Sequence, residues 1–153
     1  MEIWFYHLTR QPLDRVLPGL IEKSLERKWS VVIQIGTQER MKALDALLWT
    51  YSDSSFLAHG IDQDEDAERQ PIYLTTGFET PNAAKVRFFV DGALIAPFLT
   101  QPAAGFERLI LMFDGNQDDQ LVSARQQWAQ LKQQGLALAY WQQDEDGRWQ
   151  KKA

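Results

Sequence analysis

The stretch SVVIQIGTQERMKALDALLWTY, residues 30–51, is the clearest indication of the fold. Its first part, SVVIQI, is short and rich in β-branched residues, as is typical of a strand buried in a parallel sheet. Gly36 permits a turn, and Thr37 is a suitable N-cap for a helix with Glu39 in its first turn. A strand, a glycine turn and a capped helix make one half of a βαβ unit.

The rest of the chain continues this alternation of strands and helices. Further strands are predicted at residues 2–8, 72–76, 86–90, 108–113 and 136–142, further helices at 11–28 and 118–134, and loops at 61–70 and 93–105. Pro18 either kinks the first helix or begins it. Gly135 is placed to end the last helix, and Asp146-Gly147 predicts a hairpin turn.

These elements predict an α/β fold. We expect residues 1–153 to form a single domain with a mostly parallel sheet flanked by helices. The expected topology is similar to that of nucleotide-binding domains but has no phosphate loop. The chain contains neither the P-loop pattern nor a GxGxxG fingerprint, and the Gly36-Thr37 turn has one glycine and no following lysine.

Composition excludes several classes of function. The chain has no cysteine, so disulfides and thiolate metal sites are absent. Its start does not resemble a signal peptide, and no run approaches about 18 apolar residues, so we expect a cytoplasmic protein without a membrane span. The net charge of −5 disfavours direct binding of nucleic acid through its phosphates.

No catalytic or metal motif is present either. There is no nucleophile elbow and no HExxH pair. His7 and His59 have no histidine one helical turn away, and an isolated histidine is more often structural than catalytic. The acidic segment 61–70 lacks the central glycine and terminal glutamate of a calcium loop, which favours a solvated loop. We therefore expect no catalytic residue, no cofactor and no metal.

The helix predicted to end near residue 51 carries a tryptophan away from its apolar stripe. That stripe is formed by Met41, Leu44, Leu47, Leu48 and Tyr51 and is expected to pack on the sheet. At roughly 100° per residue, Trp49 lies roughly 140° from the centre of the stripe. Either the loop at residues 52–60 or another protein covers it, and Phe56 in that polar loop raises the same alternatives.

The helix predicted at residues 118–134 carries basic residues within its apolar stripe. Leu121, Arg125, Trp128 and Lys132 follow the spacing i, i+4, i+7, i+11. In one interpretation the basic side chains lay their stems over apolar surface and keep their charges in water. In the other, they form with the tryptophan a pocket for a peptide that ends in a hydrophobic residue and a free carboxylate.

Segments along most of the chain match one family. They are FYHL (5–8), LDALLW (44–49), SSFLAHG (54–60), FFVDG (88–92), MFDGN (112–116), ARQQWAQLKQQG (124–135), YWQQ (140–143) and GRWQKKA (147–153). Each segment alone is a weak signal, but the combination of LW, SF and HG at these spacings is specific. On these segments the chain resembles the chi subunit of the bacterial DNA polymerase III holoenzyme.

The resemblance implies a non-catalytic accessory subunit that works in DNA replication. It implies binding to the psi subunit, which connects chi to the clamp loader, and to the acidic C-terminal tail of single-stranded DNA-binding protein. DNA would then be contacted only indirectly. Trp49 and Phe56 match positions on the psi-facing surface, and His59 lies close to them in sequence. In some bacteria the same surface is expected to bind a helicase instead.

The resemblance also assigns the tail site. Arg125 matches the basic position that receives the terminal carboxylate, and Trp128 matches an aromatic residue of the pocket, with Leu121 and Lys132 beside them. Two departures remove positive charge: Ala129 stands where the family has a basic residue, and Leu121 or Gln120 replaces a lysine. Lys132, Lys151 and Lys152 are the candidates to compensate.

Two other classes of function are possible for this sequence. The main alternative is a degenerate nucleotide-binding α/β enzyme, which would need phosphate contacts that Gly36-Thr37 does not obviously supply. Direct binding of single-stranded DNA by the aromatic residues is disfavoured by the net charge of −5, since stacking platforms usually line a basic groove.

Overall fold

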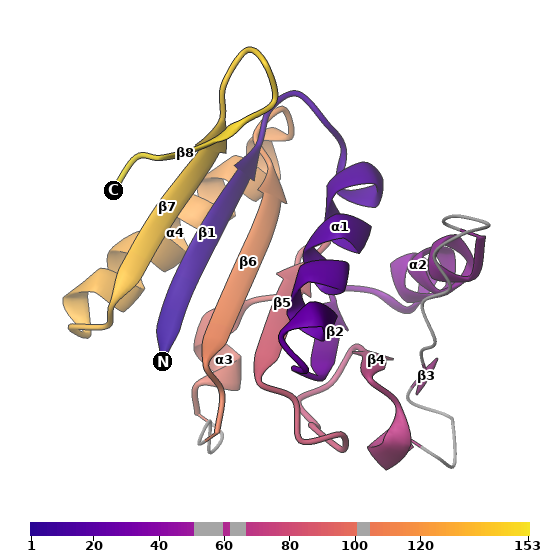
Figure 1. The fold of residues 1–153 in the computed structure, drawn as a ribbon. Coiled ribbons are helices and arrows are strands. Elements are labelled where there is room, and N and C mark those ends of the chain that lie inside the picture. Colours follow the sequence, from indigo (N-terminus) through magenta and orange to yellow (C-terminus); the bar gives the residue numbers. More distant parts are fainter. Residues whose placement is uncertain (51–59, 62–66, 101–104) are drawn as a thin grey trace.

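The computed structural model describes residues 1–50, 60–61, 67–100 and 105–153. These residues form an eight-stranded sheet in the order β3-β4-β2-β5-β6-β1-β7-β8 (Figure 1). The strands are β1 (Glu2–Leu8), β2 (Val31–Ile35), β3 (Gly60–Ile61), β4 (Ile72–Thr75), β5 (Val86–Val90), β6 (Arg108–Asp114), β7 (Leu138–Gln143) and β8 (Trp149–Lys151). Neighbouring strands are parallel except at the sheet's end, where β8 runs antiparallel to β7. The predicted α/β class with a mostly parallel sheet is confirmed.

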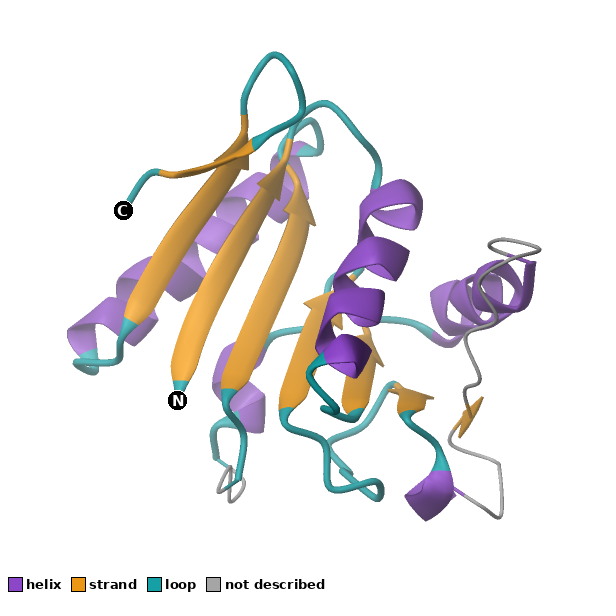
Figure 2. Ribbon diagram, viewed as in Figure 1, coloured by secondary structure: helices purple, strands orange, loops and turns teal. Residues whose placement is uncertain are grey.

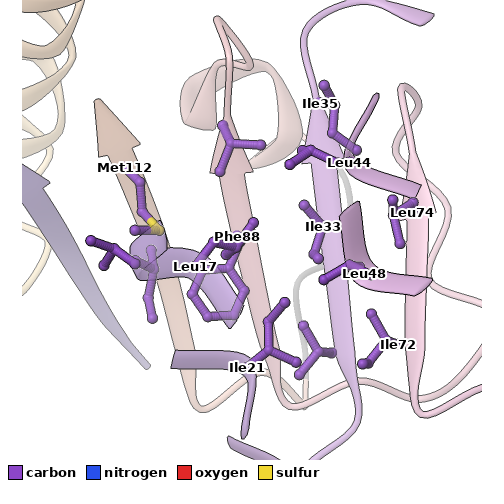
Figure 3. Packing of buried hydrophobic residues seen from close by; sticks show 14 of the residues in the cluster. Leu17, Ile21, Ile33, Ile35, Leu44, Leu48, Ile72, Leu74, Phe88 and Met112 are labelled. Carbon is purple, nitrogen blue, oxygen red and sulfur yellow. The ribbon is translucent and has the colours of Figure 1, made fainter. Parts of the chain in front are cut away.

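Helices cover both faces of this sheet (Figure 2). They are α1 (Leu13–Glu26), α2 (Gln38–Thr50), α3 (Ile95–Phe98) and α4 (Asp118–Gln133), with a short 3-10 helix, η1 (Ala67–Arg69). The core under α1 and α2 contains side chains such as Leu17 and Leu44, packed on Ile33 and Phe88 of the sheet (Figure 3). The core under α3 and α4 lies on the opposite face and includes Phe98 and Leu131.

The described part of the segment 30–51, which ends at residue 50, folds as its sequence predicts. It contains β2 and α2, and the backbone N–H of Arg40 donates to the Thr37 Oγ1 at 3.2 Å, so Thr37 caps the helix. A Cβ on Gly36 would lie 2.2 Å from the carbonyl oxygen of Asp91. The glycine is therefore required because the chain after β2 approaches the chain after β5 closely.

Several local predictions need correction. α1 begins at Leu13 and continues through Pro18, so the alternative in which the helix begins at Pro18 is wrong. The segment predicted as a loop at residues 93–105 contains α3, which is too short and too rich in proline to show helical periodicity. The two-residue strand β3 was also not predicted, because its pairing with β4 defines it more than its own sequence does.

The helices do not cover the sheet evenly. α1 lies over β5, β2 and β6, whereas no helix in the described part of the chain lies over the same face of β1 and β7 (Figure 2). The opposite face of these two strands is covered by α4. β1 therefore has one face inside the molecule and one face that is only partly covered.

Candidate functional site

The four residues predicted to bind a peptide tail lie together on α4. Leu121 and Trp128 are half-buried and pack against the core under this helix, whereas Arg125 and Lys132 are exposed. The apolar members of the predicted stripe thus face the sheet, and the basic members flank it. This arrangement is compatible with both interpretations of the stripe, so the assignment of these residues to a tail site stays a prediction.

Local sequence signals place the ends of α4. Asp118 and Asp119 lie in its first turn, where negative charge is favourable. At the other end Gly135 has a φ of +75°, and its N–H donates to the carbonyl of Lys132 at 3.0 Å. A glycine in the left-handed conformation is a common helix terminator. The predicted end of the helix at Gly135 is confirmed.

The sheet supplies aromatic partners for Trp128. Its ring packs edge-on against Phe5, with the ring centroids 5.2 Å apart, and against Tyr140 at 5.5 Å. Phe5 of β1 pairs in register with Tyr140 of β7, and His7 of β1 pairs with Phe113 of β6. Side chains two residues apart on a strand share a face. Phe5 and His7 therefore point to the same side, and the strand register brings their neighbours there.

Hydrogen bonding and stacking hold His7 in place. The Tyr140 hydroxyl lies 2.8 Å from His7 Nδ1, and the imidazole stacks on Phe113 with the centroids 4.8 Å apart. A Cβ on Gly115 would lie 1.9 Å from His7 Nε2, so the imidazole fills the space that this glycine leaves open. The predicted position of His7 at the end of the first strand is confirmed.

Arg125 influences both groups electrostatically. Burial lowers the pKa of His7 below its usual 6.5, the positive charge of Arg125 lowers it further, and Asp114 opposes both. Burial raises the pKa of Tyr140, and Arg125 opposes that shift. At neutral pH the imidazole is therefore mostly uncharged, and its Nδ1 shares a hydrogen bond with the tyrosine hydroxyl. Tyr140 thus connects the imidazole to the Trp128 ring, and the charge of Arg125 acts on both Tyr140 and His7.

The basic residues of α4 are available to an anion. Both ion pairs among the described residues involve Arg40, which contacts Asp14 at 3.2 Å and Asp91 at 3.1 Å. Within that part of the chain, Arg125 and Lys132 have no carboxylate partner. An exposed guanidinium beside a half-buried indole can pair with a carboxylate while the indole contacts an adjacent apolar group.

The structure does not test the predicted psi-facing surface. Met41, Leu44 and Leu48 of α2 are buried and Leu47 is half-buried, as the predicted stripe requires. The side chain of Trp49 and the whole of Tyr51, Phe56 and His59 lie outside the described residues. Their proposed role in binding a partner stays a prediction.

The edge of the sheet where nucleotides would bind is acidic. In open parallel sheets, ligands usually bind beyond the carboxyl ends of the strands. Here that edge has a cavity of about 260 Å³ lined by Asp14, Asp91 and Asp114, with Arg40 already paired to the first two. Gly36, the one glycine of the turn after β2, packs closely against the backbone of Asp91. Carboxylates here would repel phosphates, which disfavours the nucleotide-binding alternative.

The described residues were also compared with the requirements of a metal site and of a membrane-spanning helix. No cluster of three metal-ligating side chains occurs in the described ranges, although most of the acidic segment 61–70 falls outside them. None of the helices seen in those ranges combines the length and apolarity needed to cross a membrane.

Sequence reasoning missed the partners of Trp128 and the side chains next to them. Trp128 contacts Phe5 and Tyr140, and Tyr140 contacts His7 and Phe113. These residues come from three strands that are distant in sequence, and each segment reads simply as a core strand. A signal was present, because the alternation in FYHL puts Phe5 and His7 on one face. Only the pairing of β1 with β6 and β7 shows that this face lies under α4.

Comparison with known proteins assigns the family. Residues 1–139 match the family described as DNA polymerase III chi subunit, HolC. The chain is also 31% identical over 111 residues to a probable DNA polymerase III subunit chi of Rickettsia prowazekii (strain Madrid E), an alignment that covers 71% of this chain and 67% of the relative. The chain therefore belongs to the DNA polymerase III chi subunit family.

Proposed function

We propose that this chain is a non-catalytic accessory subunit of DNA polymerase III that connects two partners in the cytoplasm. One partner is the psi subunit, bound near the end of α2, and the other is the C-terminal tail of single-stranded DNA-binding protein, bound at α4. Membership of the chi family supports the role in the polymerase. The tail site is supported by one observation above all: the exposed Arg125 lies one turn from the half-buried Trp128 and has no carboxylate partner in the described residues.

The chemistry of the α4 surface favours a free carboxyl end. A guanidinium presents parallel N–H groups that match the two oxygens of a carboxylate. Trp128 and the half-buried Leu121 offer apolar contact on either side of Arg125. A chain that ends in a hydrophobic residue provides both groups within one residue. Lys132, one turn beyond Trp128, adds charge for acidic residues preceding that end.

A peptide titration tests the tail site. The probe is an acidic peptide that ends in phenylalanine, made once as the free acid and once as the C-terminal amide. Arg125→Ala should weaken binding of the free acid by about tenfold or more, because a charge-assisted bidentate pair is lost. Lys132→Ala should weaken it less. Arg15→Ala, which removes an exposed arginine on α1, is the matched control and should leave affinity unchanged.

The amide separates carboxylate recognition from general attraction of negative charge. It should bind the unaltered protein about as weakly as the free acid binds Arg125→Ala, and it should lose little more in that variant. Unchanged affinity for the free acid in both Arg125→Ala and Lys132→Ala would exclude the proposed site.

A capture experiment tests the second surface. Psi should be retained by the immobilised protein from an extract of the source cells, and Trp49→Ala should reduce its recovery, since buried aromatic residues dominate many interfaces. Arg125→Ala serves as the control that leaves psi recovery unchanged. Full recovery with Trp49→Ala would show that the surface is assigned wrongly; recovery of a helicase in place of psi would retain the surface and change its partner.

A further inference from the structure

The partly covered face of β1 borders a cavity of about 260 Å³. The cavity lies between α1 and the strands β1, β6, β7 and β8. Four of the chain's six tryptophans line it, namely Trp4, Trp29, Trp141 and Trp149. This face is opposite the one that packs under α4, because Trp4 and Tyr6 alternate with Phe5 and His7 along β1.

The aromatic rings support one another. Trp4 and Trp141 have their centroids 5.4 Å apart, and Tyr6 packs edge-on against Trp149 at 4.6 Å. Trp149 belongs to β8, the short antiparallel strand that closes this end of the sheet. All four tryptophans nevertheless stay partly exposed. Contiguous exposed aromatic surface is a usual property of binding sites.

Two guanidinium groups lie against these rings. The Cζ of Arg108 is 3.7 Å from the ring centroid of Trp4, and the Cζ of Arg27 is 5.2 Å from that of Trp29. Stacking covers the face of a guanidinium and leaves its N–H edge free to bind an acceptor. Burial and the positive charge of Arg27 lower the pKa of Arg108, whereas Glu2 and Glu107 oppose them.

Two hydrogen-bond donors at the cavity lack an acceptor. Arg108 Nε and Trp141 Nε1 are buried, and neither finds a hydrogen-bond partner within the described residues. Buried donors without acceptors are rare and energetically costly. By contrast, the indole N–H of Trp4 donates to Glu2 Oε2 at 3.0 Å. Two residues that line the cavity, Arg108 and Trp141, thus carry donors without an acceptor in the described residues.

The rim adds further positive charge. Lys23 and Arg27, one helical turn apart at the end of α1, are exposed and line the cavity. Neither they nor Arg108 contact a carboxylate as an ion pair within the described part of the chain, where Arg40 forms both ion pairs. A protein with a net charge of −5 thus gathers three cations at one aromatic cavity. Such complementarity favours an anionic ligand.

We propose that this cavity binds a short acidic peptide segment of a partner protein, with a carboxylate on Arg108 and Arg27 and a neighbouring apolar side chain against the tryptophans. The site is separate from the proposed tail site, which lies across the sheet. The fork of a guanidinium matches a carboxylate. The lining combines four indole rings with three cationic side chains, which suits a peptide in which acidic and hydrophobic residues are adjacent.

Single-stranded nucleic acid fits this cavity less well. Bases bind by stacking on free aromatic faces. Here Arg108 already covers one face of Trp4, and Arg27 and Arg108 lie over Trp29. A polyanion is also repelled over longer distances by the net charge of −5, which a short segment with few charges feels less.

NMR titration of the intact chain tests the proposal. Tryptophan indole N–H signals are followed while a peptide of sequence EELFEE, blocked at both ends, is added. The Trp141 indole signal should shift, since its ring lines the cavity that the peptide would occupy. Reversing the rim charges in Lys23→Glu with Arg27→Glu should weaken binding by about tenfold or more, whereas Arg15→Glu on the same helix should not. Arg108→Lys keeps the charge but loses the fork and should also weaken binding.

Controls separate this site from the tail site and from nucleic acid. The neutral peptide QQLFQQ should bind far more weakly, and Arg125→Ala should leave the Trp141 shift unchanged. Circular dichroism checks that each variant is folded. The proposal is wrong if EELFEE leaves the Trp141 signal in place, if the rim variants bind as well as the unaltered chain, or if oligothymidylate shifts the signal at lower concentration than EELFEE does.

Discussion

The two faces of β1 both carry aromatic side chains, but one face is covered by α4 and the other is only partly covered. On one face, Phe5 and His7 lie under α4 with Trp128, and the histidine has both a hydrogen bond and a stacking partner. On the other face, Trp4 and Tyr6 lie among tryptophans and arginines, with buried donors that find no acceptor in the described residues. Aromatic residues near an arginine can therefore be part of a packed core or line an accessible cavity. The difference here is whether a helix covers that face of the sheet.

The largest effect is expected from crowding the side chains between β1 and α4. In Gly115→Ala, the new Cβ would lie 1.9 Å from His7 Nε2. The imidazole cannot easily move, since Phe113 and Tyr140 hold it. We expect a loss of about 2 kcal/mol in the free energy of unfolding, measured by urea denaturation. Gly19→Ala, in α1 with open space around it, is the control and should be neutral or slightly stabilising.

A smaller effect is expected from removing one hydrogen bond. Tyr140→Phe takes away the hydroxyl that is hydrogen-bonded to His7 Nδ1 and should cost about 1 kcal/mol. Tyr6→Phe, on the other face of β1, removes a hydroxyl for which no hydrogen bond is found in the described residues. It should change stability by less than about 0.5 kcal/mol. Equal losses in the two variants would contradict the difference between the faces.

The pH dependence of stability should also distinguish the completed face. Burial and Arg125 hold the pKa of His7 below 6.5 in the folded chain. As the pH falls below about 6.5, His7 therefore binds a proton more readily in the unfolded chain than in the folded chain. The stabilisation from neutral His7 is therefore complete above about pH 6.5 and is lost as the pH falls towards the lower, folded-state pKa. The stability gap between the unaltered chain and His7→Gln should narrow between about pH 7.5 and about pH 5.5. A gap that does not change with pH would rule this out.

A small effect is also expected when Arg108 is changed on the open face. Arg108→Met removes a buried donor without an acceptor together with a stacked cation, and the two contributions oppose each other. The free energy of unfolding should change by less than about 1 kcal/mol in either direction. A large loss would mean that Arg108 stabilises the fold and that the open face is complete as it stands.

Local sequence was sufficient for most elements of the fold. The segment 30–51 predicted β2, the cap at Thr37 and α2, since β-branched residues, a capping hydroxyl and helical periodicity act over short distances. Val86–Val90 and Glu2–Leu8 were predicted with the bounds that the structure has. Elements such as α3 were missed, because four residues show no periodicity and tertiary contacts hold them in place.

For the candidate sites, too, the sequence predicted local features. The sequence alone determined that Leu121, Arg125, Trp128 and Lys132 share one side of a helix, because helical spacing is a local property. It also carried the resemblance to the chi family, which the comparisons confirm.

The surroundings of these residues depend on contacts between distant parts of the chain. The strand order places β1 between β6 and β7, which brings His7, Phe113 and Tyr140 together on one face and gathers four tryptophans and Arg108 on the other. Strand order depends on which strands pair, and that choice is made by contacts between distant parts of the chain. Periodicity within a segment tells which side chains share a face, but it cannot tell what covers that face.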